Sequence, residues 1–168
     1  MNQAQELWWS QARSDFDLFL HLRRRGTHEC HLLHYLQMAT EKLSKAYLWR
    51  SGHAPPRVHT GFVRYLRALL DRRPNELDRI AIVLGFKRRQ DLDHWVRSVQ
   101  GLAYALQNLA PAEAGDGPNP EYPWPHHAPT ETPIGHTFAL WIQLAETGQG
   151  RKRLEVIHRA VVRFDQYA

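Results

Sequence analysis

Apolar residues recur every three or four positions along most of the chain, which is the spacing of amphipathic helices. In the first segment Trp8, Ala12, Phe16 and Phe19 follow this spacing. Gly26 comes directly after this pattern, and glycine commonly ends a helix because it adopts the left-handed backbone conformation without strain. The pattern predicts an opening helix that ends just before Gly26.

The second segment carries the clearest pattern in the chain. Thr27 is the expected N-cap of this helix, and Gly52 is the expected stop. One stripe of the helix is formed by Leu32, Leu36, Ala39, Leu43, Ala46 and Arg50. We expect the part of this stripe from Leu32 to Ala46 to lie at the centre of a bundle of helices.

Helical spacing continues through the rest of the chain, and no segment alternates apolar and polar residues between hairpin turns. Three further helices are expected in the middle of the chain: one opened by Thr60 or Gly61 and carrying Phe62 to Leu70, a short one at 76–86 with Pro74 as its N1 residue, and a long one from the basic run at 87–89 to Leu106. Near the end of the chain, a helix is expected from the N-cap Thr132 and Pro133 to about Glu146. After a break at Gly148 and Gly150, a last helix is expected at 151–167. The prediction is an all-α fold, an up-and-down bundle of five to seven helices that forms one domain over residues 1–168.

Residues 110–133 differ from the rest because they contain seven prolines and two glycines. A connection of this length inside a compact domain is either a functional loop or a mobile one. Tyr122 and Trp124 predict that part of the loop packs onto the bundle.

Charge and cysteine content narrow the classes of function. The 168 residues carry a formal net charge of +5, which favours an anionic partner such as RNA, a nucleotide or an acidic protein surface, with a solvated basic surface as the alternative. Cys30 is the single cysteine, so an internal disulfide is excluded and a reducing compartment fits. No apolar run reaches the roughly 20 residues needed to span a bilayer. The expected location is the cytoplasm, with no membrane association.

The helix Tyr35–Ala46 and the segment Asn119–Pro123 together resemble the HEPN family (higher eukaryote and prokaryote nucleotide-binding domain). The helix Tyr35–Ala46 is similar to the "AEK…KA" helix of that family, and it is followed by Gly52, a proline pair and His59. Asn119–Pro123 is similar to a tyrosine–proline element that the family places before its last helices. The resemblance extends over most of the chain but depends on about a dozen residues.

The resemblance implies a non-catalytic homodimer that binds a nucleotide, RNA or a partner protein and often acts beside a nucleotidyltransferase. The ligand-binding residues implied in this way are Glu41, Lys42, Lys45, His59 and Tyr122. An alternative interpretation of Glu41 and Lys45 is an ordinary surface ion pair, because they stand at positions i and i+4 in the favourable order.

One subset of the family cleaves RNA without metal, using an arginine followed after four to six residues by a histidine. The histidine moves a proton and the arginine stabilises phosphate charge. The chain contains three such pairs, which are Arg23 with His28, Arg89 with His94, and Arg153 with His158. Arg89 with His94 and Arg153 with His158 are the candidate catalytic pairs, because each lies near the start of a late helix. Residues at i and i+5 lie about 140° apart around a helix, so convergence requires a frayed turn or a partner subunit.

No cofactor and no metal are predicted. The histidines at 28, 31 and 34 repeat every third residue near Cys30, but a zinc site needs three or four well-placed ligands, so an exposed histidine-rich face is the preferred interpretation. The leading hypothesis is therefore the non-catalytic binding module. A metal-independent endoribonuclease of toxin or defence type is the second, and a purely structural interaction subunit is the third.

Overall fold

The computed structural model describes residues 1–49, 61–109, 118–124 and 132–168, and within these ranges the protein is all-helical with no β-strand. The seven α-helices of the described ranges are α1 (Gln3–Arg24), α2 (Glu29–Leu48), α3 (Phe62–Leu70), α4 (Pro74–Leu84), α5 (Arg89–Gln107), α7 (Ala139–Ala145) and α8 (Gly148–Val162), and the 3-10 turns are η2 (Pro133–Gly135) and η3 (Phe164–Gln166). All seven α-helices contribute buried residues to a hydrophobic core cluster. The predicted all-α bundle is confirmed.

Helix α1 has well-formed ends at both termini. Asn2 accepts a hydrogen bond from the Gln5 backbone, and the Gln5 side chain accepts one from the Asn2 backbone. At the other end Gly26 has a φ of 65°, and the Thr27 N–H donates to the Leu22 carbonyl. Gly26 therefore ends the helix as predicted, in the left-handed conformation that glycine adopts most readily.

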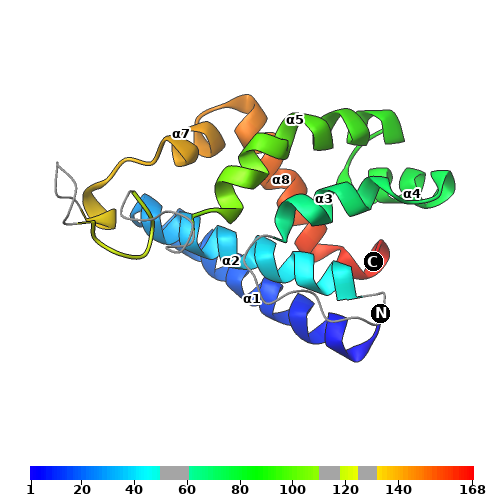
Figure 1. Ribbon diagram of the computed structural model, residues 1–168, viewed down its shortest axis with the longest axis horizontal. Coiled ribbons are helices and arrows are strands. Elements are labelled where there is room, and N and C mark those ends of the chain that lie inside the picture. The colour runs from blue at the N-terminus through cyan, green and yellow to red at the C-terminus, as the bar shows by residue number, and fades with distance from the viewer. Residues whose placement is uncertain (50–60, 110–117, 125–131) are drawn as a thin grey trace.

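Helix α2 runs antiparallel to α1 and supplies the middle of the core (Figure 1). The predicted central stripe is buried, with relative exposures of 3% or less at Leu32, Leu36, Ala39, Leu43 and Ala46. Arg50 and Gly52 lie outside the described residues. The N-cap is His28 rather than the predicted Thr27, because the first backbone hydrogen bonds of the helix, from His31 and Leu32, go to the His28 carbonyl.

Helix α8 brings the end of the chain back to its beginning. The indole Nε1–H of Trp9 donates to the Val161 carbonyl at 2.6 Å, and the Trp9 ring stacks on Phe164. The two termini accordingly lie at the same end of the molecule (Figure 1). α8 thus packs along α1 and gives α1 a second interface beside the one with α2.

The helix predicted from Pro133 to about Glu146 is wrong as a continuous element. Thr132 and Pro133 start only the short turn η2, the backbone then extends through Phe138, and α7 begins at Ala139. The Phe138 N–H donates to the Glu29 carboxylate at 2.8 Å, and the Phe138 side chain is buried. This contact with the start of α2 replaces the helical hydrogen bond that the local sequence would otherwise favour.

The expected break at Gly148 and Gly150 falls earlier than predicted. Thr147 is the N-cap of α8, its hydroxyl accepts from the Gly150 N–H at 2.8 Å, and both glycines lie in the first turn of the helix. A Cβ on Gly150 would overlap the backbone carbonyls at the end of α7. Glycine at this position therefore permits a tight turn between α7 and α8 instead of interrupting a helix.

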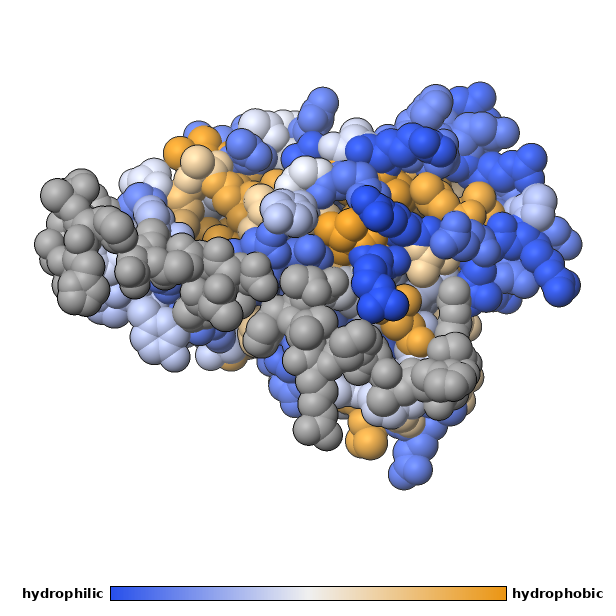
Figure 2. Space-filling model, in the orientation of Figure 1, coloured by the Kyte–Doolittle hydropathy of each residue, from blue (hydrophilic) through white to orange (hydrophobic). Residues whose placement is uncertain are grey.

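The last helix, predicted to reach residue 167, ends at Val162 and is followed by the separate turn η3, while the other helix predictions hold with small shifts at their ends. Pro74 is the first residue of α4, and Gly85, with a φ of 88°, stops that helix two residues before the predicted end. Apolar residues on the displayed face form separate groups, one of them over α7, while hydrophilic residues dominate the end where α4 meets α5 (Figure 2). Among the described helices, none combines the length and the hydropathy that crossing a bilayer requires.

Candidate functional site: a basic hollow between the first and last helices

The candidate catalytic pair on α5 does not converge. Arg89 is the first residue of the helix, and its Nη1 lies 3.8 Å from Asp78 Oδ2 on α4. His94 is exposed further along α5. Because a regular helix turns about 100° per residue, the two side chains leave α5 in different directions.

The candidate pair on α8 is also divided. Arg153 lines a hollow between α5 and α8, where its Nη2 donates to the Ser98 carbonyl at 3.4 Å. His158 lines another hollow, between α1 and α8, and stacks on Phe16 with ring centroids 5.5 Å apart. Within one chain, therefore, neither predicted pair forms a composite site.

The α1–α8 hollow is formed by matching positions on the two helices and has a volume of about 270 Å³. Its lining residues are Phe16, Phe19, Leu20 and Arg23 from α1 and Arg151, Leu154, Glu155 and His158 from α8. On each helix these residues are spaced i, i+3, i+4 and i+7, so each set lies on one face. The apolar members form the floor, and the charged members lie around it.

The charges around this hollow are mainly positive and mostly unpaired. Neither Arg23 nor Arg151 makes an ion pair with a carboxylate of the described residues, although Arg151 donates to the Glu146 carbonyl at 3.1 Å. The one acidic member, Glu155, is paired with Lys152 and Arg159 on its own helix. Partial burial raises the pKa of Glu155, but these two cations outweigh that effect and hold the pKa below its ordinary value. Two guanidinium groups and an exposed imidazole are thus available to an anion.

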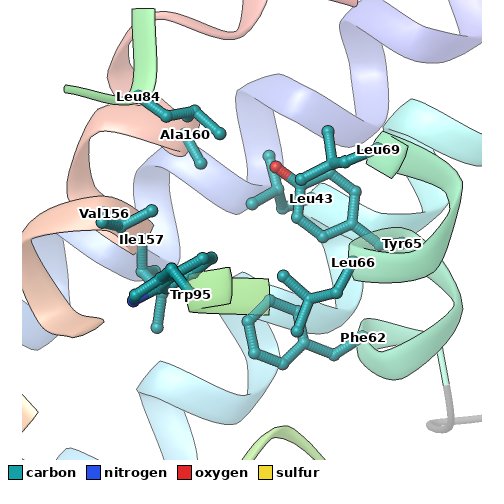
Figure 3. Close-up of a pocket in the computed structure, with 10 residues that line it drawn as sticks. All are labelled: Leu43, Phe62, Tyr65, Leu66, Leu69, Leu84, Trp95, Val156, Ile157 and Ala160. Atoms are coloured by element: carbon teal, nitrogen blue, oxygen red, sulfur yellow. The ribbon is translucent and has the colours of Figure 1, made fainter. Parts of the chain in front are cut away.

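A second cavity lies in the core and is unsuited to a ligand. Figure 3 shows its lining, which comes from α2, α3, α4, α5 and α8 and is apolar except for the hydroxyl of Tyr65 and the indole nitrogen of Trp95. Its volume is about 10 Å³, which is at the lower limit for a single water molecule. This cavity is a packing feature.

Three of the predicted ligand-binding residues lie in the α1–α2 interface. Lys42 Nζ is 2.6 Å from Asp15 Oδ2, and Lys45 pairs with Glu41 while its ammonium group lies 5.0 Å from the centre of the Trp8 ring. The Glu41 and Lys45 side chains are only 7% and 11% exposed, so the interpretation as a surface ion pair is wrong. Lys42 and Lys45 contact α1 through Asp15 and Trp8, whereas Glu41 pairs with Lys45 within α2, and ligand binding by Glu41, Lys42 and Lys45 stays a prediction.

The other two predicted ligand residues belong to the connections. His59 lies outside the described residues, and Tyr122 is 59% exposed. Asn119 Oδ1 accepts from the Glu121 and Tyr122 backbone N–H groups, which turns the chain so that Glu121 approaches His34 on α2. The prediction that part of this stretch packs onto the bundle is confirmed by Trp124, which is 4% exposed, and Tyr122 belongs to the part that does not pack.

No group of three or more histidine, cysteine, aspartate or glutamate side chains in the described ranges could hold a metal ion. Cys30 is buried, and burial raises the pKa of its thiol, so the thiolate form is disfavoured. The chain therefore offers no reactive thiol at this position.

Comparisons with protein-family models, with curated proteins and with solved structures found no match to this chain. The resemblance to the HEPN family stays a prediction that depends on the residues named above. Sequence reasoning identified His158 but missed its grouping with Arg23 and Arg151. The matching i, i+3, i+4, i+7 spacing on the first and last helices was the available signal, but nothing in the sequence showed that the two faces meet.

Proposed function

We propose that this protein is a non-catalytic helical module of the cytoplasm that binds a nucleotide or RNA through the α1–α8 hollow and forms a homodimer. The observation that carries the proposal is the placing of Arg23, Arg151 and His158 around an apolar floor without a carboxylate partner for either arginine. Arginine binds phosphate through charge-assisted hydrogen bonds, and an exposed aromatic ring offers a surface on which a base stacks. The net charge of +5 adds long-range attraction for such a ligand.

We include a lack of catalysis in the proposal because the arginine and the histidine of each predicted pair lie apart and contact different residues. Arg89 faces Asp78, and Arg153 faces the α5 backbone at Ser98. Each histidine is left without the arginine that the sequence had paired with it.

Isothermal titration with uridine and adenosine 5′-monophosphate tests the binding site. Arg23→Ala and Arg151→Ala are each expected to weaken binding about tenfold or more, the decrease expected on removing a hydrogen bond to a charged group. Arg13→Ala is the matched control, since Arg13 is an exposed arginine of α1 outside the hollow. Equal weakening in all three variants, or no binding of either nucleotide, would refute the proposed site. Sedimentation equilibrium tests the dimer.

One observation favours a second candidate function, the metal-independent endoribonuclease. His158 is exposed and shares a hollow with two arginines, which are the residue types that move a proton and stabilise phosphate charge. Incubation of the protein with total RNA in the presence of chelator separates the two candidates. Cleavage that His158→Ala abolishes and His94→Ala retains would favour the nuclease, whereas intact RNA would favour the binding module.

A further inference from the structure

A second hollow flanks α8 on the side away from α1. It lies between α5 and α8 and is lined by Trp95 and Ser98 from α5 and by Gly148, Gln149, Lys152 and Arg153 from α8. Its volume of about 270 Å³ equals that of the α1–α8 hollow. Both hollows pair cationic side chains with an aromatic ring, since His158 lines one and Trp95 lines the other.

The surface between the two hollows carries a consecutive basic run. Arg151 lines the α1–α8 hollow, and the next two residues, Lys152 and Arg153, line the α5–α8 hollow. The single acidic residue of α8 is Glu155, whose charge is opposed by Lys152 and Arg159. The first two turns of α8 therefore form a cationic ridge with an aromatic hollow on each side.

The cations of the second hollow make only long hydrogen-bond contacts, although the Lys152 ammonium group also lies 5.3 Å from the centre of the Phe86 ring. Lys152 Nζ lies 3.5 Å from Glu155 Oε2, and Arg153 Nη2 lies 3.4 Å from the Ser98 carbonyl, both long for hydrogen bonds. A phosphate could replace either interaction with a shorter, charge-assisted one.

From these observations, and resting on the proposed function, we infer that the ligand is a single-stranded oligonucleotide whose backbone crosses α8 from one hollow to the other. A helix with its side chains is about 10–12 Å across, so a mononucleotide in one hollow does not reach the other. Alternating phosphates and bases match the alternation of cations and aromatic rings. A duplex keeps the faces of its bases stacked, so a single strand fits the exposed His158 and the half-buried Trp95 better.

The experiment measures fluorescence polarisation with labelled oligouridylates of two, four and eight nucleotides, beside uridine 5′-monophosphate as competitor. Affinity is expected to rise at least tenfold between the mononucleotide and the tetranucleotide. Arg153→Ala, which leaves the Lys152–Glu155 pair intact, is expected to reduce this gain and to leave mononucleotide affinity within twofold, and the double variant Lys152→Ala, Arg153→Ala is expected to remove the gain. Its slope of log affinity against log salt for the octanucleotide should be shallower by about 0.7 for each phosphate that the variant no longer neutralises.

Three results would count against a single strand that crosses α8 from one hollow to the other. Affinity that does not depend on length, or equal weakening of mononucleotide and oligonucleotide in Arg153→Ala, overturns it and leaves the proposed function standing. Tighter binding of a duplex of the same length overturns the single-strand assignment. Absence of binding for the mononucleotide and for every oligonucleotide overturns both proposals. The circular dichroism and thermal midpoint of each variant establish that the fold is retained.

Discussion

Helix α1 takes part in two interfaces that differ in whether their charged side chains have a partner of opposite charge. Against α2, the buried carboxylate of Asp15 pairs with Lys42, and the buried Glu41 of α2 pairs with Lys45, whose ammonium group lies over the Trp8 ring of α1. Against α8, Arg23 and Arg151 lie at the edge of a hollow and have no carboxylate partner among the described residues. The contrast separates charges that hold helices together from charges that remain available to a ligand, although both kinds occur on the same helix.

The largest effect is expected from removing Glu41, the partner of Lys45 in a buried pair on α2 that lies beside Trp8 of α1. Glu41→Ala leaves the Lys45 ammonium group uncompensated in a side chain that is 11% exposed, and such a change costs about 3–5 kcal/mol. Urea denaturation measures this decrease in stability. Glu155→Ala is the control, because Glu155 pairs with two cations but is 44% exposed, and its removal should cost less than about 1 kcal/mol. Equal costs would show that burial does not distinguish the two pairs.

The next largest decrease in stability is expected at the turn between α7 and α8, which positions Arg151 at the hollow. Gly150→Ala places a methyl group against the backbone carbonyls of Gln143 and Leu144, so we expect a decrease of about 1–3 kcal/mol in the free energy of unfolding. At Gly148 an added methyl group meets nothing within 4 Å, so Gly148→Ala should change stability by less than about 0.5 kcal/mol. Thermal unfolding of the two variants side by side checks the comparison.

A buried, uncharged pair joins Tyr65 on α3 to Tyr167 at the end of the chain, and its loss should decrease stability by an intermediate amount. The Tyr65 hydroxyl donates to Tyr167, which donates to the Ala160 carbonyl. Tyr167→Phe deprives Tyr65 of its acceptor and should cost about 1–3 kcal/mol, whereas Tyr65→Phe leaves the second bond intact and should cost about 0.5–1.5 kcal/mol. A larger cost in Tyr65→Phe would contradict this direction of donation.

The same pair predicts a decrease of stability at alkaline pH. Burial raises the pKa of both Tyr65 and Tyr167 above the ordinary value, so the folded state keeps both phenols neutral. An unfolded tyrosine ionises near pH 10, so this contribution is complete below about pH 10 and is lost as the pH rises above it. Stability curves measured up to pH 11 should fall less steeply in the double Phe variant, by up to about 1.4 kcal/mol per pH unit for each tyrosine.

The smallest effect on stability is expected at the unpaired arginines. Arg23→Ala and Arg151→Ala remove surface side chains that have no carboxylate partner in the described ranges, so each should change the free energy of unfolding by less than about 0.5 kcal/mol. Chemical denaturation measures this change, and the same variants are those expected to bind nucleotide more weakly. A cost above about 2 kcal/mol in either variant would assign that arginine to the fold and not to a ligand.

The helices were predictable because their apolar spacing is a local property. The stripe from Leu32 to Ala46 identified the buried face of α2, and Pro74 identified the start of α4. The stretch from Pro133 to Glu146 was not predictable in the same way, since its backbone depends on the Glu29 carboxylate, a residue more than a hundred positions earlier. The candidate site was predicted only in part, because His158 shares its hollow with Arg151, seven residues earlier on α8, and with Arg23 on α1, a helix whose position against α8 the sequence does not reveal.

By itself the sequence determined most of the helical segments, which stripe of α2 is buried and that the protein is basic, since periodicity and composition act over a few residues or over the whole chain. Only the tertiary structure decided which charges are paired, where α7 begins and that Arg23, Arg151 and His158 line one hollow. The physical reason is that pairing and burial depend on which helix faces meet. That meeting is set by the packing of the whole core and not by the spacing within any one helix.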